Sequence, residues 1–308
     1  MTPYVQQRLA RFVDRESEMS CFSGMLERTD GPRPIMLIWG EGGMGKSSLL
    51  MRMIHEVSVR ALGKAEVFWT DTRNHDYVAV MRKVRDDVGA GSFIEFTNLI
   101  NFFTAPPQHR IEVVVGTRGP INVGAGMGLG EGASVGTMAG VVVEKDAITI
   151  KDLMLTDPRN DLGISENDRM MRLTDQFIKE LNVAASARKI VIFLDAVEKA
   201  TDLTQRWVWN ELLGAVRDDR LVNVCFVLGG RNQPAIDERW RPLIEEKQLG
   251  PLKQEHIVEY LQKRGIDPGE GVRDAVAGAI LAFTEGNPFK VASAVEAMAR
   301  RQEQKTGP

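Results

Sequence analysis

The chain has 308 residues, of which 43% are hydrophobic and 26% are charged, and these proportions are ordinary for a folded globular protein. Its length allows one to three domains with a sizeable core. The formal net charge of −3 excludes a general electrostatic attraction to nucleic acid or to an anionic membrane, although it leaves room for a local basic patch. The two cysteines are far apart and form neither a disulfide framework nor a metal-ligand spacing, and no signal peptide is visible, so we expect a reducing, cytoplasmic environment.

The first predicted elements lead into a glycine-rich motif. After a helix within residues 12–27, an apolar strand runs from Ile35 to Trp39 and enters Gly40-Glu-Gly-Gly-Met-Gly-Lys-Ser-Ser. This stretch fills every fixed position of G-x-x-x-x-G-K-[ST], the phosphate-binding P-loop, and a helical pattern follows it. A glycine-rich turn without a ligand is the alternative interpretation.

The residue types of this motif suit phosphate chemistry. Glycines let backbone N–H groups curl around phosphate oxygens, Lys46 can reach the β- and γ-phosphates, and the Ser47 hydroxyl can hold Mg²⁺. We therefore expect a nucleotide-phosphate site formed by Gly40, Gly42, Gly43, Met44, Gly45, Lys46, Ser47 and Ser48.

Further apolar runs predict strands at residues 66–71, 189–195 and 221–231, with helices around 76–88 and 92–103. Because these runs are continuously apolar and are separated by helices, they predict an α/β fold with a parallel central sheet covered on both faces. From residue 250 the pattern becomes helical, over 254–265, 271–285 and 288–304. We expect a nucleotide-binding α/β domain over 1–248 and a small helical lid over 249–308.

Residues 105–150 interrupt this scheme, because nine of the 25 residues from Gly116 to Gly140 are glycine. A strand pair with its turn near Glu144–Asp146 is expected after this run. The segment is interpreted as a glycine-rich β-hairpin insertion, either a flexible one or a contact surface for a partner or a neighbouring subunit. So much glycine makes a poor membrane-spanning helix, and no membrane span is expected.

Two acids and an arginine complete the expected machinery. Asp195 ends the third strand, where a carboxylate can hold Mg²⁺ together with Ser47. Glu198 is placed to orient or deprotonate the attacking water, although it can also be a solvated or helix-capping charge. Arg231 ends the fourth strand after two glycines and can face the γ-phosphate, although it can also be an ordinary strand-end arginine. The expected catalytic set is Lys46, Asp195, Glu198 and Arg231.

The order of these motifs resembles the STAND class of P-loop ATPases, which contains the NB-ARC and NACHT switches and is related to origin-recognition AAA+ ATPases. The resemblance spans residues 12–290, apart from 105–165, and rests on Phe12-Val-Asp-Arg-Glu-Ser-Glu, the P-loop, Leu194-Asp-Ala-Val-Glu, Gly230-Arg231, Leu249-Gly-Pro-Leu and Gly286-Asn-Pro-Phe. Asp14 stands where the family usually has glycine. The resemblance implies that the segment containing Arg15 wraps the adenine of ATP or ADP and that Pro288 packs against it.

The function implied is a nucleotide-operated switch that hydrolyses ATP slowly. The partner is expected to be a second copy of the chain or a separately encoded effector or sensor, unless the chain belongs to a longer protein, because neither an effector domain nor a repeat sensor is recognisable here. A DNA-associated ATPase of the origin-recognition or transposition-regulator kind is the alternative, and the scattered basic residues disfavour it. A small-molecule kinase ranks below both.

Overall fold

The computed structural model describes residues 6, 10–27, 33–71, 76–104, 110–115, 150–156, 165–266, 269 and 271–306. The chain divides into two compact units, Met1–Asn98 with Met171–Pro308, and Leu99–Met170. Within the described ranges, no helix is long and apolar enough to cross a membrane. The glycine-rich run and most of the strand pair predicted after it lie outside the described residues.

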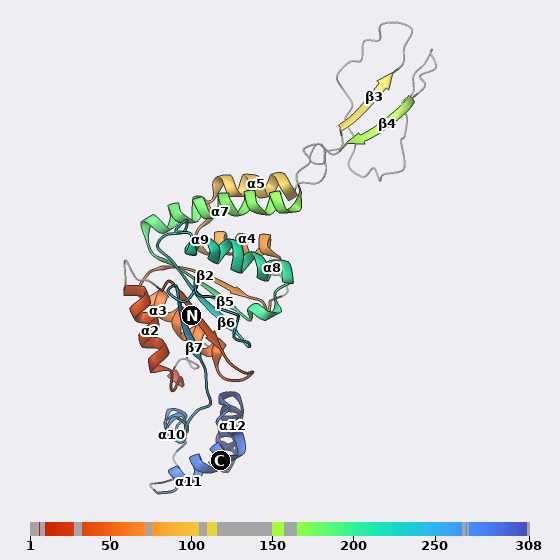
Figure 1. The fold of residues 1–308 in the computed structure, drawn as a ribbon. Helices are drawn as coiled ribbons and strands as arrows, with labels where there is room; N and C mark the ends of the chain where they lie inside the picture. The colour runs from red at the N-terminus through yellow and green to blue at the C-terminus, as the bar shows by residue number, and fades with distance from the viewer. Residues whose placement is uncertain are drawn as a thin grey trace. The chain divides into compact units, whose positions relative to one another are not determined.

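The first unit is built on a parallel sheet of five strands in the order β2-β5-β6-β1-β7 (Figure 1). The strands are β1 (Ile35–Trp39), β2 (Gly63–Phe68), β5 (Ile190–Asp195), β6 (Val224–Gly230) and β7 (Ile244–Gln248). The predicted α/β fold with a parallel sheet is therefore confirmed. Because all strands run the same way, their carboxyl ends meet at one edge, where ligands of such sheets bind.

Two details of the sheet differ from the sequence-based prediction. Strand β2 begins three residues before the predicted Glu66, because the mixed sequence Gly-Lys-Ala at its start pairs with β5 in spite of its weak apolar character. Strand β7 was not predicted. Its sequence, Ile-Glu-Glu-Lys-Gln, is charged because it is an edge strand, and it pairs only with β1 among the described strands.

Helices cover both faces of this sheet (Figure 1). Their bounds are α2 (Glu16–Glu27), α3 (Lys46–Val59), α4 (Tyr77–Val88), α7 (Glu166–Ala187), α8 (Asp202–Trp207) and α9 (Leu213–Arg217), with short turns η1 (Ala90–Ser92), η2 (Val197–Lys199) and the π-helical η3 (Val208–Leu212). Helices α2 and α3 pack on alternate residues of β1, β5 and β6, and this cluster contains the fully buried Phe22, Leu49 and Phe193. The strand residues between these face the other way and are also buried, which is why each run is continuously apolar.

Three further helices form a small bundle after β7. They are α10 (Gln254–Lys263), α11 (Arg273–Thr284) and α12 (Pro288–Thr306), as the helical pattern predicted. The bundle, called the lid below, has its own apolar cluster, which includes Ile257, Leu261 and Val295, all fully buried. The domain boundary at residue 248 stays a prediction.

The second unit contains a β-hairpin. Strands β3 (Arg110–Val115) and β4 (Ile150–Thr156) pair antiparallel, with an irregularity between Val113 and Val115. Helix α5 (Ile94–Thr104) precedes the hairpin along the chain, and α7 follows it. Strand β3 therefore lies within the predicted insertion of residues 105–150, and β4 begins at its last residue.

Candidate functional site

The P-loop lies between the end of β1 and the start of α3, and neighbouring atoms leave little room for a side chain at two of its glycines, Gly40 and Gly43. A Cβ atom on Gly40 would lie 2.9 Å from the carbonyl oxygen of Leu249, the residue after β7. Gly43 has a φ of +84°, which side-chain-bearing residues rarely adopt, and a Cβ there would lie 2.7 Å from Oδ1 of Asn287 in the lid. The loop is thus held between the strand-end segment and the lid.

Lys46 folds back across this loop. Its ammonium donates hydrogen bonds to the carbonyl oxygens of Gly40, at 2.5 Å, and Glu41, at 2.8 Å. Burial lowers the pKa of Lys46, while the negative charges of Glu198 and Asp195 act to raise it. The lysine therefore lies among the carboxylates predicted to act with it.

Ser47 and Asp195, the two predicted Mg²⁺ ligands, are in contact although they are 148 positions apart in the sequence. The Ser47 hydroxyl donates to Oδ2 of Asp195 at 2.7 Å, and the Ala196 N–H donates to Oδ1 at 2.9 Å. Asp195 is 5% exposed, and this burial raises the pKa of its carboxyl, although both hydrogen bonds act to lower it. A hydroxyl and a carboxylate are oxygen ligands that Mg²⁺ accepts together with phosphate oxygens, so the pair fits this ion.

Glu198 and Arg231 also meet. Glu198 lies in η2, which begins after Ala196 in the left-handed conformation, with φ of +60°. Its Oε2 accepts a hydrogen bond from the Arg231 N–H at 3.3 Å, and its Oε1 lies 3.6 Å from Nε of Arg231. The structure thus places the predicted water-orienting acid and the predicted phosphate-facing arginine next to each other. Their catalytic roles stay predictions.

Sequence reasoning missed Gly229. This residue lies in β6 directly opposite Asp195 of β5, and a Cβ on it would come within 2.6 Å of Oδ1 of that acid. Only a glycine leaves room for the carboxylate beside Ser47. The glycine pair before Arg231 was visible in the sequence, but the register that aligns it with Asp195 was not.

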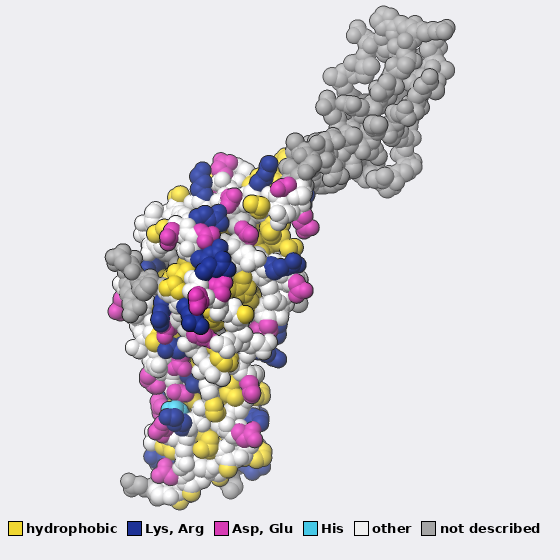
Figure 2. All heavy atoms as spheres, in the orientation of Figure 1, with side chains coloured by type: hydrophobic (Ala, Val, Ile, Leu, Met, Phe, Trp, Pro, Cys, Tyr) yellow, Lys and Arg dark blue, Asp and Glu magenta, His cyan; other side chains and the backbone are white. Residues whose placement is uncertain are grey.

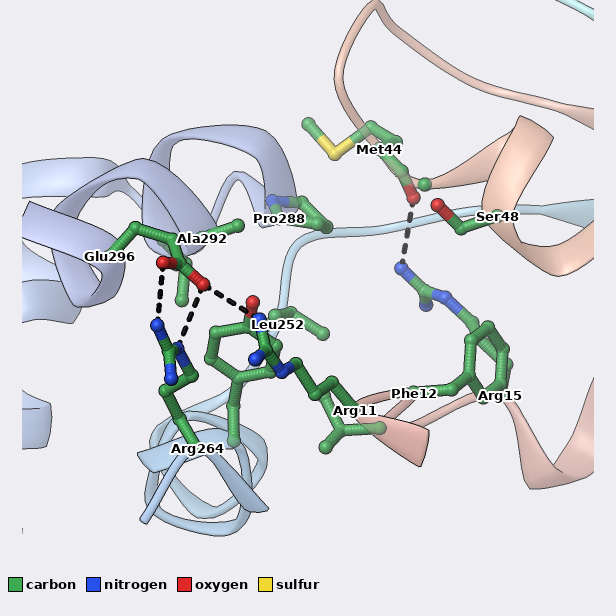
Figure 3. Close-up of a pocket in the computed structure, with 14 residues that line it drawn as sticks. Arg11, Phe12, Arg15, Met44, Ser48, Leu252, Arg264, Pro288, Ala292 and Glu296 are labelled. Atoms are coloured by element: carbon green, nitrogen blue, oxygen red, sulfur yellow. Dashed lines mark hydrogen bonds and ion pairs between the residues drawn. The ribbon is translucent and has the colours of Figure 1, made fainter. Parts of the chain in front are cut away.

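Beside the P-loop lies a cavity of about 480 Å³, which is within the range of nucleotide and cofactor sites. Of the residues predicted to bind nucleotide, it is lined by Arg15, Met44, Gly45, Ser48 and Pro288. Figure 3 shows three walls: the P-loop with Met44 and Ser48, the lid, and the N-terminal segment of residues 11–15.

Arg15 joins the N-terminal segment to the P-loop and to Gly250, which lies between β7 and the lid. Its Nη2 donates to the carbonyl oxygens of Gly250 at 2.6 Å and Met44 at 3.4 Å, and its Nη1 lies 2.9 Å from Oδ2 of Asp14. Asp14 has a φ of +63°, in the region where glycine is most at ease and aspartate is tolerated better than most residues. These bonds of the Arg15 guanidinium go to protein oxygens, and a direct contact of Arg15 with nucleotide stays a prediction.

A charged group at another wall of the cavity was not predicted. Glu296 accepts one hydrogen bond from Arg11, at 2.8 Å, and two from Arg264, both at 2.9 Å (Figure 3). The hydrogen bonds from Arg264 lower the pKa of the Glu296 carboxyl. No local spacing in the sequence relates these residues, because they belong to the N-terminal segment, the residue that follows α10, and α12.

A P-loop on a parallel sheet, with an acid at the neighbouring strand end bonded to the P-loop serine, defines the class of P-loop nucleotide triphosphatases. Residues 11–227, more than half of the chain, match the model of the AAA ATPase domain family. The chain therefore belongs to the AAA ATPase domain family. The predicted resemblance to P-loop ATPases is confirmed, and the family assignment identifies the chain as an ATPase domain.

Several solved structures are similar in fold. A Walker-type ATPase of Pyrococcus abyssi matches with 15% identity and a TM-score of 0.49, over 94% of this chain and 68% of that one. A STAND protein with a tetratricopeptide repeat sensor from Pyrococcus horikoshii matches with 15% identity and a TM-score of 0.44, over 90% of this chain but only 28% of that one. DnaA from Aquifex aeolicus, bound to AMPPCP, matches with 12% identity and a TM-score of 0.39, over 96% and 70%. The comparison with curated proteins returned no match.

Proposed function

We propose that this chain binds ATP or ADP with Mg²⁺ between the P-loop and the lid, and that it hydrolyses ATP slowly. The observation that carries the proposal is the hydrogen bond between Ser47 and Asp195, with Lys46 nearby, at the carboxyl edge of a parallel sheet. The adjoining cavity of about 480 Å³ supports a bound nucleoside as the second half of the ligand.

Each predicted residue then has a task. Lys46 would bind the β- and γ-phosphates, while Ser47 and Asp195 would hold the Mg²⁺ that neutralises charge on the phosphates. Glu198 would orient the attacking water. Both oxygens of Glu198 contact Arg231, one through the backbone N–H at 3.3 Å and one at 3.6 Å from Nε, and each oxygen keeps a lone pair that can accept a hydrogen bond from water.

The nucleotide state would act as a switch of the STAND type. Because the lid and the N-terminal segment both line the cavity, a nucleotide that contacts them changes the stability of their contacts with the P-loop. We infer that ATP favours an arrangement that binds a second copy of the chain or a separately encoded effector or sensor. A prokaryotic defence or signalling system would use such a switch.

Binding and assembly are tested separately. Titration calorimetry with ATP and Mg²⁺ should show binding to the wild type and none to Lys46→Ala, while Lys83→Ala, which removes a lysine of a surface ion pair, should bind normally. Mass photometry should show a larger species when ATP and Mg²⁺ are added, but not with Lys46→Ala. Nucleotide binding without a change of mass would refute the proposed switch function but not the proposed ATPase function.

The DNA-associated alternative is less favoured by the surface. Basic and acidic side chains are interspersed over the face shown in Figure 2, rather than gathered into a basic stripe. Filter binding to duplex DNA at two salt concentrations distinguishes the two functions, because phosphate contacts make DNA binding strongly salt-dependent. Tight, salt-sensitive binding would support the alternative.

A further inference from the structure

The lid bonds directly to the P-loop through two consecutive carbonyl groups. Nδ2 of Asn287, the residue before α12, donates to the carbonyl oxygen of Gly42 at 3.2 Å. The backbone N–H of Phe289 donates to the carbonyl oxygen of Gly43, also at 3.2 Å. These carbonyls belong to the part of the loop whose N–H groups surround phosphate in P-loops.

The other end of the Asn287 side chain is also engaged. Its Oδ1 accepts hydrogen bonds from the N–H groups of Phe289, at 3.1 Å, and Lys290, at 3.3 Å, and so caps the first turn of α12. The side-chain amide of Asn287 can be oriented in only one way to make all of these bonds, because Nδ2 must donate to the Gly42 carbonyl while Oδ1 accepts from the two N–H groups of α12. One side chain therefore caps the lid helix and fastens it to the P-loop.

The two lid contacts fix the orientation of the Gly42 and Gly43 carbonyls, and therefore also that of the N–H groups in the same peptide units. In a trans peptide the C=O and N–H point in opposite directions, so the N–H groups of Gly43 and Met44 point away from the lid contacts. The Met44 N–H donates a hydrogen bond to the Glu41 carbonyl oxygen, with 3.4 Å between nitrogen and oxygen, and the same oxygen accepts a hydrogen bond from the Lys46 ammonium at 2.8 Å. This N–H is thus turned toward the side of the loop occupied by Lys46, the residue that binds the β- and γ-phosphates in P-loops.

We infer that Asn287 is a positioning residue for phosphate binding: from the lid, it holds the peptide units of Gly43 and Met44 with their N–H groups turned toward the bound polyphosphate. The inference rests on the proposed nucleotide function and deepens it. Because coupling between two binding events is reciprocal, a nucleotide that carries β-phosphate also strengthens the lid contact. Adenosine, which has no phosphate, does not.

The test uses Asn287→Ser in the full chain. A serine hydroxyl still caps a helix, but it is too short to reach the Gly42 carbonyl and carries no amide donor. Affinities for ATP, ADP and adenosine are measured by competition against a fluorescent ATP analogue. We expect ATP and ADP to bind about fivefold more weakly, the equivalent of about one hydrogen bond, and adenosine to bind as to the wild type. Asn210→Ser, at an exposed position, is the matched control.

The outcomes separate this inference from the proposed function. Equal weakening of adenosine would mean that Asn287 only supports the lid, and unchanged affinities for ATP and ADP would mean that the contact has no effect; either result overturns the inference and leaves nucleotide binding intact. A wild-type protein that binds no nucleotide would overturn both. Asn287→Ala, which removes the cap as well, should lower the thermal stability of the lid, whereas Asn287→Ser should not.

Discussion

Replacing Gly229 by alanine tests whether Asp195 must sit where the structure places it. The new Cβ would lie 2.6 Å from Oδ1 of Asp195, whereas ordinary contact begins at 3.4 Å, so the carboxylate or the strand must move by about 0.8 Å. Asp195 cannot move freely, because Ser47 and the Ala196 N–H bond to its two oxygens. Overpacking of this kind costs about 1–3 kcal/mol of folding free energy. A misplacement near 1 Å lowers a catalytic rate by about 100-fold.

Steady-state ATP hydrolysis and thermal unfolding, each with and without Mg²⁺, measure these effects. We expect Gly229→Ala to lose about 10- to 100-fold in kcat and to need more Mg²⁺ for half-maximal rate. Gly230→Ala is the matched control, since its Cβ would meet its nearest neighbours, Glu198 and Asn232, at ordinary distances of 3.6 and 3.7 Å. If both variants hydrolyse ATP at the wild-type rate, the position of Asp195 does not limit the reaction and the reasoning fails.

Three further predictions concern other buried groups. Glu180 accepts the two N–H groups at the start of α5, at 2.9 and 3.0 Å, so Glu180→Ala should lose about 2–3 kcal/mol in urea unfolding while the exposed Lys179→Ala loses little; equal losses would contradict this role. Because burial raises the pKa of Asp195 above 3.8, its stabilising contribution is complete below that pH and is lost as the pH rises through the raised pKa. Without Mg²⁺, Asp195→Asn should therefore gain stability relative to the wild type as the pH rises above about 4, and a constant difference would refute the cause. Burial raises the pKa of the Cys225 thiol to about 11, so a disulfide reagent at pH 8 should modify Cys21 alone in the folded protein, as intact mass will show; a second adduct before unfolding would count against it.

The parts of the fold that sequence predicted well are those with strong local patterns. The strands β1, β5 and β6 are continuously apolar because both of their faces are covered, and the three lid helices carry helical periodicity. Strand β7 has neither property. Its charged residues form a strand because they pair with β1, which is a tertiary contact. No local sequence pattern therefore predicted β7.

The sequence by itself determined the chemistry at the P-loop, because Gly40 to Ser47 are adjacent and their spacing is the motif. It also supplied Asp195 as a candidate partner by its position at the end of a strand, while the family resemblance supplied Pro288 at the start of a helix. The tertiary structure alone decided that Ser47 bonds to Asp195 and that Gly229 must leave room beside it, since both depend on how β5 and β6 align. It likewise decided that Asn287 fastens the lid to the loop. Such contacts join residues far apart in the chain, and only the packing of whole elements sets their distances.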